Sequence, residues 1–509
     1  MRLAALDLGT NSFHLLVAEV QPDGHFSPVV REKEMLRLGD VVSREGRITP
    51  EAADRAVETV RRFRLLAEAA GAAEIHACAT SAIRGAANGD ALVDRIEADT
   101  GVEVRVIDGL TEAQLIFGAV RASVLLEPAP ALCFDLGGGS VEIMVGDATG
   151  LRYATSENLG VGRLTAALVH SDPLSKDDRR ALRDHITDGL EPVAAAVAPH
   201  SPQLVVGSSG TLEDLARMVA ARRDHAVPAS LNQLMITRDE LAPLHKLLTT
   251  GKAAERRKIE GLDSRRVDLI PAGSMFLHTA MDVFGFDTLT VSEWALREGI
   301  LLDAIGRHDP ADWSDDPRAI RRASVQGLAR RCDVSQAHSS QVTRMALALF
   351  DGTTELHGLD AHDRELLEHA ATLHNIGQHV SNEGHHRHAA YLIRHGGLRG
   401  FDPDEVRLLA AIARWHRRGN PKETDEAPGP YGRDGEARLR KLTALLRVAD
   451  GLDRGHHDAV RDLDVHVGSS LVRVRARHDV HDVELEQWAA RRRRELFEKV
   501  FDRELEVTG

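Results

Sequence analysis

The sequence has few cysteines and no long hydrophobic run. Its 509 residues include only Cys78, Cys133 and Cys332, which are far apart and form no CxxC pair. This pattern excludes a disulfide framework and a cysteine zinc site, and it indicates reduced thiols in a cytoplasmic protein. No segment approaches the ~18 apolar residues of a membrane span. The chain starts directly with a strand-like segment, so we expect no signal peptide.

Basic residues are in the minority. There are 64 lysines and arginines against 78 aspartates and glutamates, which gives a net charge of −14. This balance argues against a chain that binds nucleic acid along its whole length, and a polyanionic substrate would require local basic patches. The apolar fraction of 43% is ordinary for globular proteins. The length predicts three or four domains of about 100–200 residues each.

Two short segments have nearly the same sequence. DLGTNS begins at Asp7, DLGGGS begins at Asp135, and each follows an apolar segment with strand character. A third turn, GSSGT from Gly207, also follows an apolar strand and opens a helix. One such turn alone is usually a simple connection, but three predict a phosphate cleft between two similar halves, because their amides, hydroxyls and carboxylates suit a phosphate and its metal ion. The predicted phosphate-binding residues of the turns are Asp7, Gly9, Thr10, Asn11, Ser12, Gly137, Gly138, Gly139, Ser140, Gly207, Ser208, Ser209, Gly210 and Thr211.

The order of predicted elements changes along the chain. Strands and helices alternate through the first ~305 residues, for example at the predicted helix 50–70, and this alternation is typical of α/β architecture. The polar, proline-containing segment 309–317 is a predicted linker, and a helical region follows it. The last part, 461–509, has two alternating stretches, a predicted helix at 484–501 and a terminal strand.

Seven segments in the first 305 residues are similar to one known family. They are LDLGTNSFHLLV (6–17), ATSAIRGAANGDAL (79–92), GLTEAQLIFGAV (109–120), DLGGGSVEI (135–143), VGSSGT (206–211), RVDLIPAG (266–273) and VSEWALREGIL (291–301). In this order they resemble the Ppx/GppA branch, exopolyphosphatases and guanosine pentaphosphate phosphatases, of the acetate/sugar kinase–Hsp70–actin superfamily. The segment 373–393 resembles the HD-like helical domain of the long members of this branch.

The resemblance implies a fold with four parts. Two ribonuclease H-like (actin-like) α/β domains, 1–125 and 126–307, would enclose the cleft. An all-α HD-like domain, 308–460, and a small α+β subdomain, 461–509, would follow.

The resemblance also implies roles for five side chains. Glu112 occupies the position of the family's catalytic base, although a carboxylate that merely favours a helix start is the alternative. Asp135 would hold Mg²⁺, largely through water molecules, and Glu142 would position the metal or the attacking water unless it is a solvated strand-edge residue. Asp7 would act like Asp135 or only stabilise its own turn. Arg84 would bind a phosphate bidentately, with a plain surface arginine as the alternative.

By resemblance, the expected function is Mg²⁺-dependent release of orthophosphate from the end of inorganic polyphosphate. Removal of the γ-phosphate of guanosine pentaphosphate (pppGpp) is the alternative. An actin-like ATPase or sugar kinase and a non-catalytic nucleotide sensor are alternatives of other classes, and the segments around Arg84 and Glu112 disfavour them. We expect a cytoplasmic homodimer without a membrane or specific nucleic-acid partner.

The helical region contains histidines but an incomplete metal motif. An HD-type site needs a His, a His-Asp doublet and a later Asp, and His338, His374 and Asp450 supply only part of it. The doublet here is His374-Asn375, and a neutral amide is a much weaker ligand than a carboxylate. We therefore predict a metal-free domain with a structural or substrate-channel role. The arginines at 491–494 would face solvent on a helix.

Overall fold

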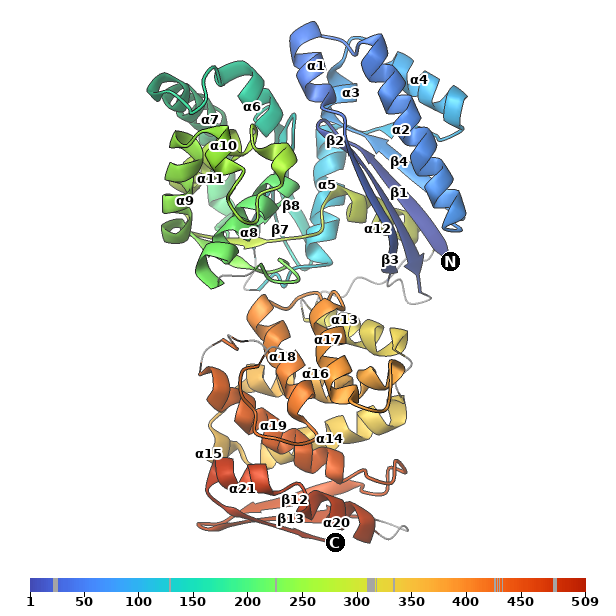
Figure 1. Ribbon diagram of the computed structural model, residues 1–509, viewed down its shortest axis with the longest axis vertical. Helices are drawn as coiled ribbons and strands as arrows, with labels where there is room; N and C mark the ends of the chain where they lie inside the picture. Colours follow the sequence, from blue (N-terminus) through green and yellow to red (C-terminus); the bar gives the residue numbers. More distant parts are fainter. Residues whose placement is uncertain are drawn as a thin grey trace. The chain divides into compact units, whose positions relative to one another are not determined.

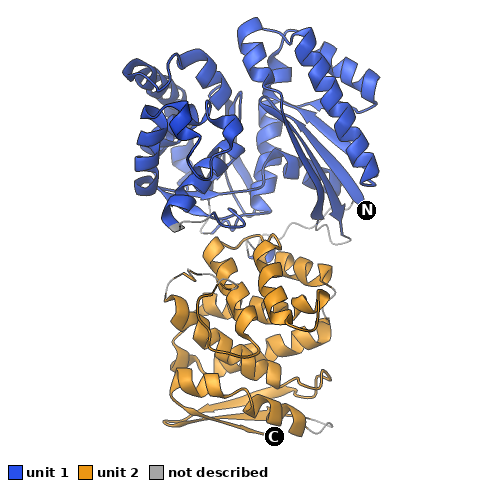
Figure 2. Cartoon of the chain, viewed as in Figure 1, with its two compact units in different colours: residues 1–320 blue, residues 321–509 orange. Residues whose placement is uncertain are grey.

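The computed structural model divides the chain into two compact units, Met1–Ile320 and Arg321–Gly509 (Figure 2). It describes residues 1–21, 26–127, 130–224, 227–308, 316, 318–332, 335–424, 427, 429, 431–432, 434–478 and 483–509. The linker predicted at 309–317 therefore lies outside the described residues, except for Asp316. The finer division into four domains stays a prediction.

The first half of the first unit is built on a five-stranded sheet (Figure 1). Its strand order is β3-β2-β1-β4-β5, in which β1, β2 and β3 are antiparallel and β4 and β5 run parallel to β1. The elements are β1 (Arg2–Leu8), β2 (Ser12–Val20), β3 (Phe26–Met35), α1 (Leu38–Glu45), α2 (Pro50–Ala69), β4 (Glu74–Ala79), α3 (Ser81–Gly85), α4 (Gly89–Thr100) and β5 (Val104–Val106).

The second half repeats this topology and adds an edge strand. The order β8-β7-β6-β9-β11 again places three antiparallel strands before two parallel ones, and β10 pairs antiparallel with β11. The repeat confirms the prediction of two ribonuclease H-like halves in an actin-like fold. The elements are β6 (Ala131–Leu136), β7 (Val141–Asp147), β8 (Gly150–Glu157), α6 (Val161–Leu168), α7 (Lys176–Val197), η1 (Ala198–His200), β9 (Leu204–Ser208), α8 (Gly210–Asp224), β10 (Met235–Thr237), α9 (Arg238–Thr250), α10 (Ala253–Arg256), η2 (Ser264–Arg266), α11 (Ile270–Phe284) and β11 (Thr288–Val291).

Two helices lie between the two sheets. Helix α5 (Gly109–Arg121) packs against β7 and β8, and α12 (Leu296–His308) packs against β1 and α5. One buried cluster joins both halves through these helices, including Leu3, Ile116, Met144 and Leu301. This shared core connects the halves behind the turns that end β1 and β6, and α5 carries Glu112 in its first turn.

Helix α2 illustrates how local sequence determines an element. Thr49 lies in an extended conformation and its hydroxyl accepts a hydrogen bond from the Ala52 amide at 3.3 Å. Pro50 occupies the first helical position, where no amide donor is needed. Val57, Val60 and Phe63 face the first sheet and are fully or almost fully buried. The helix predicted at 50–70 is confirmed within one residue.

The second unit is a helical body with a small sheet (Figure 1). The single helix predicted at 484–501 is wrong, because α20 ends at Arg491 and α21 starts at Glu495. Between them the amides of Arg493 and Arg494 bond to carbonyl groups three residues back instead of four. The elements are α13 (Ala319–Arg331), α14 (Gln336–Gly352), α15 (Thr354–His357), α16 (Ala361–Leu373), η3 (Ile376–His379), α17 (His385–His395), α18 (Pro403–Trp415), α19 (Gly435–Gly451), β12 (Asp462–Val467), β13 (Leu471–Arg477), α20 (Glu484–Arg491), α21 (Glu495–Phe501) and β14 (Glu504–Thr508). The terminal strand is confirmed, and the sheet order is β12-β13-β14.

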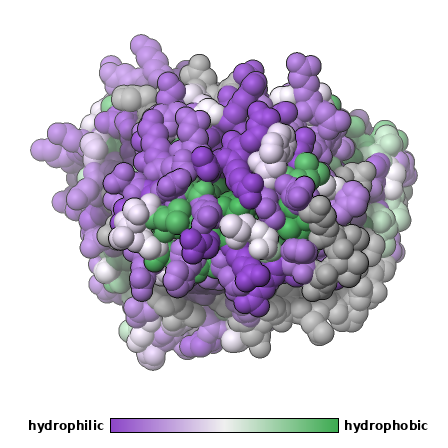
Figure 3. Space-filling model, turned by 90° about the horizontal axis from the view of Figure 1, so that it is seen from below, coloured by the Kyte–Doolittle hydropathy of each residue, from purple (hydrophilic) through white to green (hydrophobic). Residues whose placement is uncertain are grey.

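The surface is largely polar. Figure 3 shows a face on which hydrophilic side chains predominate around a band of hydrophobic ones. Leu485 and Trp488 of α20 are among the large apolar residues that remain about half exposed. In the part of the chain that the structure describes, no helix combines the length and the apolar character that crossing a bilayer requires.

Candidate active site

The three glycine turns meet in one cleft of the first unit. Its cavity volume is about 410 Å³, and residues of all three turns line it. The turns lie between β1 and β2, between β6 and β7, and between β9 and α8. Of the predicted site residues, Gly207, Ser208 and Arg84 do not line the cleft, and the others do. The residues that line it are Asp7, Gly9, Thr10, Asn11, Ser12, Glu112, Asp135, Gly137, Gly138, Gly139, Ser140, Glu142, Ser209, Gly210 and Thr211.

The first two turns touch each other. A Cβ atom added to Gly138 would lie 2.4 Å from Asn11 Cγ, and one added to Gly139 would lie 2.9 Å from Thr10 Oγ1. The Thr10 hydroxyl also accepts a hydrogen bond from the Ala82 amide at 3.2 Å. Only glycine permits this approach, so the DLGGGS turn needs its glycines for packing as well as for its own conformation.

The second turn directs its amides into the cleft. The carbonyl group of Gly138 accepts a hydrogen bond from the Gly162 amide at 2.9 Å, and that of Gly139 accepts one from Arg163 Nε at 3.0 Å. The amides of Gly138 and Gly139 donate to no group among the described residues. The carbonyl groups of this turn are thus hydrogen-bonded within the protein, whereas the two amides are available to bind an anion in the cleft.

The third turn is strained at Ser209. Its φ angle is 101°, a left-handed conformation that non-glycine residues adopt at a free-energy cost. The turn opens α8, and Gly210 and Thr211 at the start of this helix line the cleft. Arg266 lies directly over Gly210, where an added Cβ would approach its guanidinium to about 2 Å. The strained turn therefore combines a helix N-terminus with a cation, an arrangement that suits a phosphate.

Four of the predicted site residues bring carboxyl groups to the same cleft, which Glu213, Asp214 and Asp263 also line. Burial raises the pKa of Asp7 to about 7, of Asp135 to about 6 and of Glu142 to about 7, and it raises the pKa of Glu112 well above its usual value. Mutual repulsion adds to the effect, since Asp135 raises the pKa of both Asp7 and Glu142. Arg297 partly compensates by lowering the pKa of Asp7 and Asp135. The carboxyl groups of Asp7, Glu112, Asp135 and Glu142 therefore ionise less readily than isolated carboxyl groups do.

The donor set of these carboxylates fits Mg²⁺. Asp7 Oδ1 is buried and has no hydrogen-bond partner among the described residues. Ser208 donates to Asp135 Oδ2 at 2.7 Å, which leaves Oδ1 available. Glu142 accepts from Ser156 at 2.7 Å and is also hydrogen-bonded by Ser140. In the described part of the chain, no three of these carboxyl groups place oxygens within 4.8 Å of one another. This spacing suits an ion that retains part of its water shell.

Arg84 lies behind Glu112 instead of facing the cleft. Its Nη1 is 3.3 Å from Glu112 Oε2 and donates to the Ile107 carbonyl group at 2.5 Å. Asp108 caps the same helix start by accepting from the Thr111 amide at 2.7 Å. In this structure Arg84 orients Glu112 and lowers its pKa; its predicted contact with a phosphate stays a prediction.

Sequence reasoning gave no role to several cations that line the cleft. They are Arg31, Lys33, Arg217, Arg265, Arg266 and Arg297. Arg31 and Lys33 are two residues apart on β3, so both lie on one face of the strand. This alternation could have predicted a pair of cations on that face. Arg266 and Arg297 lie within two of the segments that carry the family resemblance, but nothing in their local sequence indicates a substrate contact.

Comparison with known proteins shows the family of the chain. The sequence pattern of the Ppx/GppA phosphatase family matches residues 16–308, more than half of the chain, and that of Ppx/GppA phosphatase domain III matches residues 320–493. The chain belongs to the Ppx/GppA phosphatase family. Membership confirms the resemblance inferred from the motifs and the prediction of a hydrolytic enzyme.

Individual relatives of the family match about three fifths of the chain. Exopolyphosphatase 1 of Mycobacterium leprae is 34% identical over 327 residues, 64% of this chain and 94% of the relative. Exopolyphosphatase 1 of Mycobacterium tuberculosis is 35% identical over 303 residues, 59% of this chain and 88% of the relative. A crystal structure of an exopolyphosphatase from Cytophaga hutchinsonii has a TM-score of 0.57 and 31% identity, and it covers 60% of this chain and 98% of that chain. The Aquifex aeolicus Ppx/GppA family member has a TM-score of 0.53 and 26% identity, with 61% and 99% covered.

Proposed function

We propose that this protein is an exopolyphosphatase that releases orthophosphate from the end of inorganic polyphosphate. The observation that carries the proposal is the convergence in one cleft of three glycine turns with the carboxyl groups of Asp7, Glu112, Asp135 and Glu142. The relatives named exopolyphosphatase, which are 34% and 35% identical to this chain over the matched residues, support the substrate. A terminal phosphate would lie among the amides of Gly138, Gly139 and Gly210.

The character of the cleft wall favours polyphosphate over a nucleotide. Arg31, Lys33, Arg265 and Arg266 add positive charge to the lining beyond the turns. Asp263 pairs with Lys33 and Arg265, and Asp214 pairs with Arg266. Burial and the neighbouring Arg266 lower the pKa of Lys33 to about 8, so a bound polyanion would relieve the crowding of like charges. Among the described residues, no Phe, Tyr or Trp lines the cleft, which leaves a guanine base without an aromatic stacking partner.

Glu112 is the proposed general base. It lies in the first turn of α5, and burial with the charge of Glu142 raises its pKa well above its usual value. A carboxylate with a raised pKa is a stronger base toward the attacking water than an ordinary one. Arg84 orients the carboxylate through the contact to Oε2. Proton transfer from water to Glu112 then accompanies the break of the terminal phosphoanhydride bond.

Asp135 and Glu142, with Asp7, are the proposed holders of Mg²⁺. When bound, the ion would neutralise charge on the phosphate oxygens and on the carboxylate cluster. Its proposed ligands come from β1, β6 and β7, so the metal would also connect the two halves of the first unit. A cytoplasmic location and a homodimer also belong to the proposal and rest on the family resemblance.

Phosphate release from three substrates tests the proposal. Long-chain polyphosphate, pppGpp and ATP are incubated in parallel with the full-length chain and Mg²⁺, and orthophosphate is measured. We expect release to be fastest from polyphosphate. Faster release from pppGpp would replace the proposed substrate by the nucleotide, and no release from any of the three would refute the enzymatic function.

A further inference from the structure

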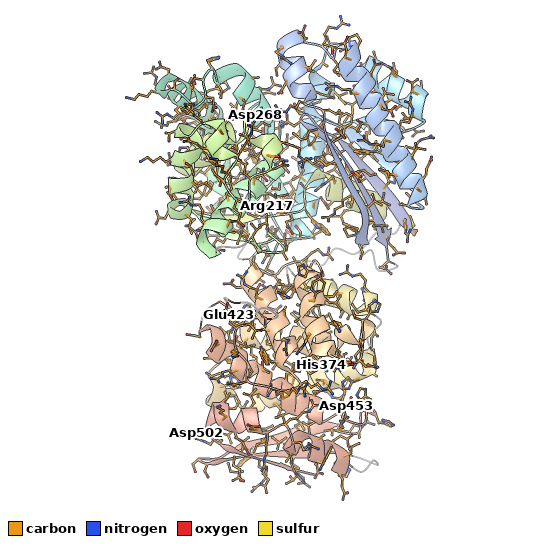
Figure 4. All side chains as sticks on the ribbon, in the orientation of Figure 1. Arg217, Asp268, His374, Glu423, Asp453 and Asp502 are labelled. Atoms are coloured by element: carbon orange, nitrogen blue, oxygen red, sulfur yellow. The ribbon has the colours of Figure 1, made fainter. Side chains whose placement is uncertain are left out.

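A second cluster of buried polar side chains lies in the second unit. His338 comes from α14, His374 directly follows α16, and Asp450 lies near the end of α19. His374 is completely buried and His338 is 4% exposed. Asp450 Oδ1 is 3.6 Å from His338 Nε2 and 3.5 Å from His374 Nε2. Figure 4 labels His374 and shows it within the helical body.

The other nitrogen of each imidazole already has a partner. His338 Nδ1 is 2.7 Å from Asp453 Oδ2, and His374 Nδ1 is 2.6 Å from the Ala371 carbonyl oxygen. Because a carboxylate and a carbonyl group only accept hydrogen bonds, Nδ1 carries the proton in both rings, and Nε2 is left with a lone pair. A metal-binding histidine typically has its second nitrogen held in this way.

The two Nε2 atoms lack any compensating group. Both are buried and have no hydrogen-bond partner among the described residues. Two lone pairs and Asp450 Oδ1 thus face one another inside the protein, while Arg493 engages the other oxygen of Asp450. A cation among the three atoms would give each of them a partner.

The spacing of the three atoms suits tetrahedral coordination. Bonds of about 2.0–2.2 Å arranged tetrahedrally place neighbouring ligand atoms about 3.3–3.6 Å apart. The two distances to Asp450 Oδ1, 3.5 and 3.6 Å, fall within or at the edge of this range. Octahedral Mg²⁺ with bonds of about 2.1 Å would need about 3.0 Å between adjacent ligands. Two imidazoles and one carboxylate are also the donors that Zn²⁺ accepts and Mg²⁺ seldom uses.

We propose that His338, His374 and Asp450 form a binding site for a divalent transition metal of the Zn²⁺ class. Three protein ligands leave a fourth position for water or a small anion. Asp453 is a positioning residue, since it holds the His338 ring through Nδ1. Asp450 Oδ2 is engaged by Arg493, which leaves Oδ1 for the metal. The expectation that 491–494 face solvent is therefore wrong for Arg493, whose side chain is 19% exposed.

This proposal reverses the expectation of a metal-free domain. That expectation depended on Asn375, the neutral residue in place of a doublet aspartate. In the structure the three ligand atoms come together without residue 375. The three residues are far apart in the sequence, so the sequence alone did not indicate that their side chains lie close together. The site lies in the second unit and does not depend on the function proposed for the first.

Titration with Co²⁺ and Zn²⁺ tests the site directly. The full-length, tag-free chain is stripped with a chelator and titrated with Co²⁺ in excess Mg²⁺, and visible absorption and bound metal are recorded. We expect about one tightly bound ion per chain with the intense absorption of four-coordinate Co²⁺, which Zn²⁺ displaces. If the unaltered chain shows no absorption from bound Co²⁺, or only the weak absorption of octahedral Co²⁺, the proposal is overturned.

Variants assign the binding to these residues. H374Q and D450N should each weaken Co²⁺ binding by about 100-fold or more, because each removes a direct ligand. H456N is the matched control: His456 is exposed and stacks on His338 at 3.8 Å, and its φ of 57° tolerates asparagine. It should bind Co²⁺ like the unaltered chain. Equal binding by D450N, or equal loss in H456N, would contradict the ligand set.

A measurement on the unaltered chain covers the case of variants that do not fold. Zn²⁺ that binds only the folded second unit must raise the temperature at which that unit unfolds. We expect this rise with Zn²⁺ and little or none with Mg²⁺. Unfolding is monitored by intrinsic fluorescence, for which Trp415 and Trp488 are the tryptophans of this unit. An unfolding temperature that Zn²⁺ leaves unchanged would overturn the proposal.

Discussion

The hydrogen bond from Ser208 to Asp135 controls the charge of the proposed metal ligand. Ser208 is 2% exposed on β9, directly beside Asp135 on β6, and its hydroxyl donates to Oδ2 at 2.7 Å. Burial raises the pKa of Asp135 to about 6, and this bond opposes the rise. Replacing Ser208 by alanine removes the donor and leaves the backbone register unchanged. The carboxylate should therefore ionise less readily.

The size of the effect follows from the hydrogen bond. A bond to a charged group contributes about 1.5–3 kcal/mol, which corresponds to about 1–2 pKa units. The pKa of Asp135 would rise from about 6 to about 7–8. At pH 7 the ionised fraction would fall from about 90% to about 10–50%, and the apparent Mg²⁺ affinity would fall about 2- to 10-fold. At pH 9 Asp135 is almost fully ionised in both proteins, so the difference should nearly disappear.

Mg²⁺ titrations of phosphate release between pH 6 and about 9 measure this change. Ser123→Ala is the matched control, because Ser123 is also fully buried but bonds to the Val120 carbonyl group and the Ser292 hydroxyl instead of a carboxylate. It should leave the Mg²⁺ dependence as it is. An S208A protein whose Mg²⁺ dependence matches the unaltered chain at pH 7, or whose defect is constant up to pH 9, would refute the reasoning.

Two further substitutions test the turns and the base. Gly138→Ala places a methyl group 2.4 Å from Asn11 Cγ, so it should lower kcat/KM for polyphosphate by about 10-fold or more. Gly118→Ala is the control, because nothing lies within 4 Å of the added methyl group, and it should leave kcat/KM unchanged. Equal activities of the two variants would contradict the packing argument. Arg84→Gln removes the cation that lowers the pKa of Glu112, so the acidic limb of the pH–kcat/KM profile should move to higher pH. An unmoved limb would show that Arg84 does not act through Glu112.

Local patterns were sufficient to predict much of the first unit. The repeated DLG turns follow apolar strands, and short-range glycine chemistry fixes where those strands end, so the duplicated halves could be inferred. The position of α5 between the sheets could not be inferred, because it results from contacts such as Ile116 with Met144 in a core that both halves share. The break between α20 and α21 likewise depends on Arg493 turning toward Asp450, a contact across 43 residues.

The candidate site also contains residues that the sequence predicts and residues whose positions depend on tertiary contacts. Turn residues that bind through their backbone are recognisable from glycine and hydroxyl spacing, and the structure brings most of them to one cleft. The place of Arg84 behind Glu112 depends on a contact over 28 residues, and the cations of β3 reach the cleft only through sheet pairing. His338, His374 and Asp450 are the clearest case, since only the packing of α14, α16 and α19 brings them together.

The most direct test of the account is the turnover of Glu112→Gln. The amide keeps the shape of the side chain but does not accept the proton of water, so phosphate release from polyphosphate should fall on the order of 10²–10⁴-fold. Polyphosphate binding, measured separately by equilibrium titration with Mg²⁺, should change little, because the turns that hold the phosphate remain intact. Turnover equal to that of the unaltered chain would contradict the account by removing Glu112 from catalysis.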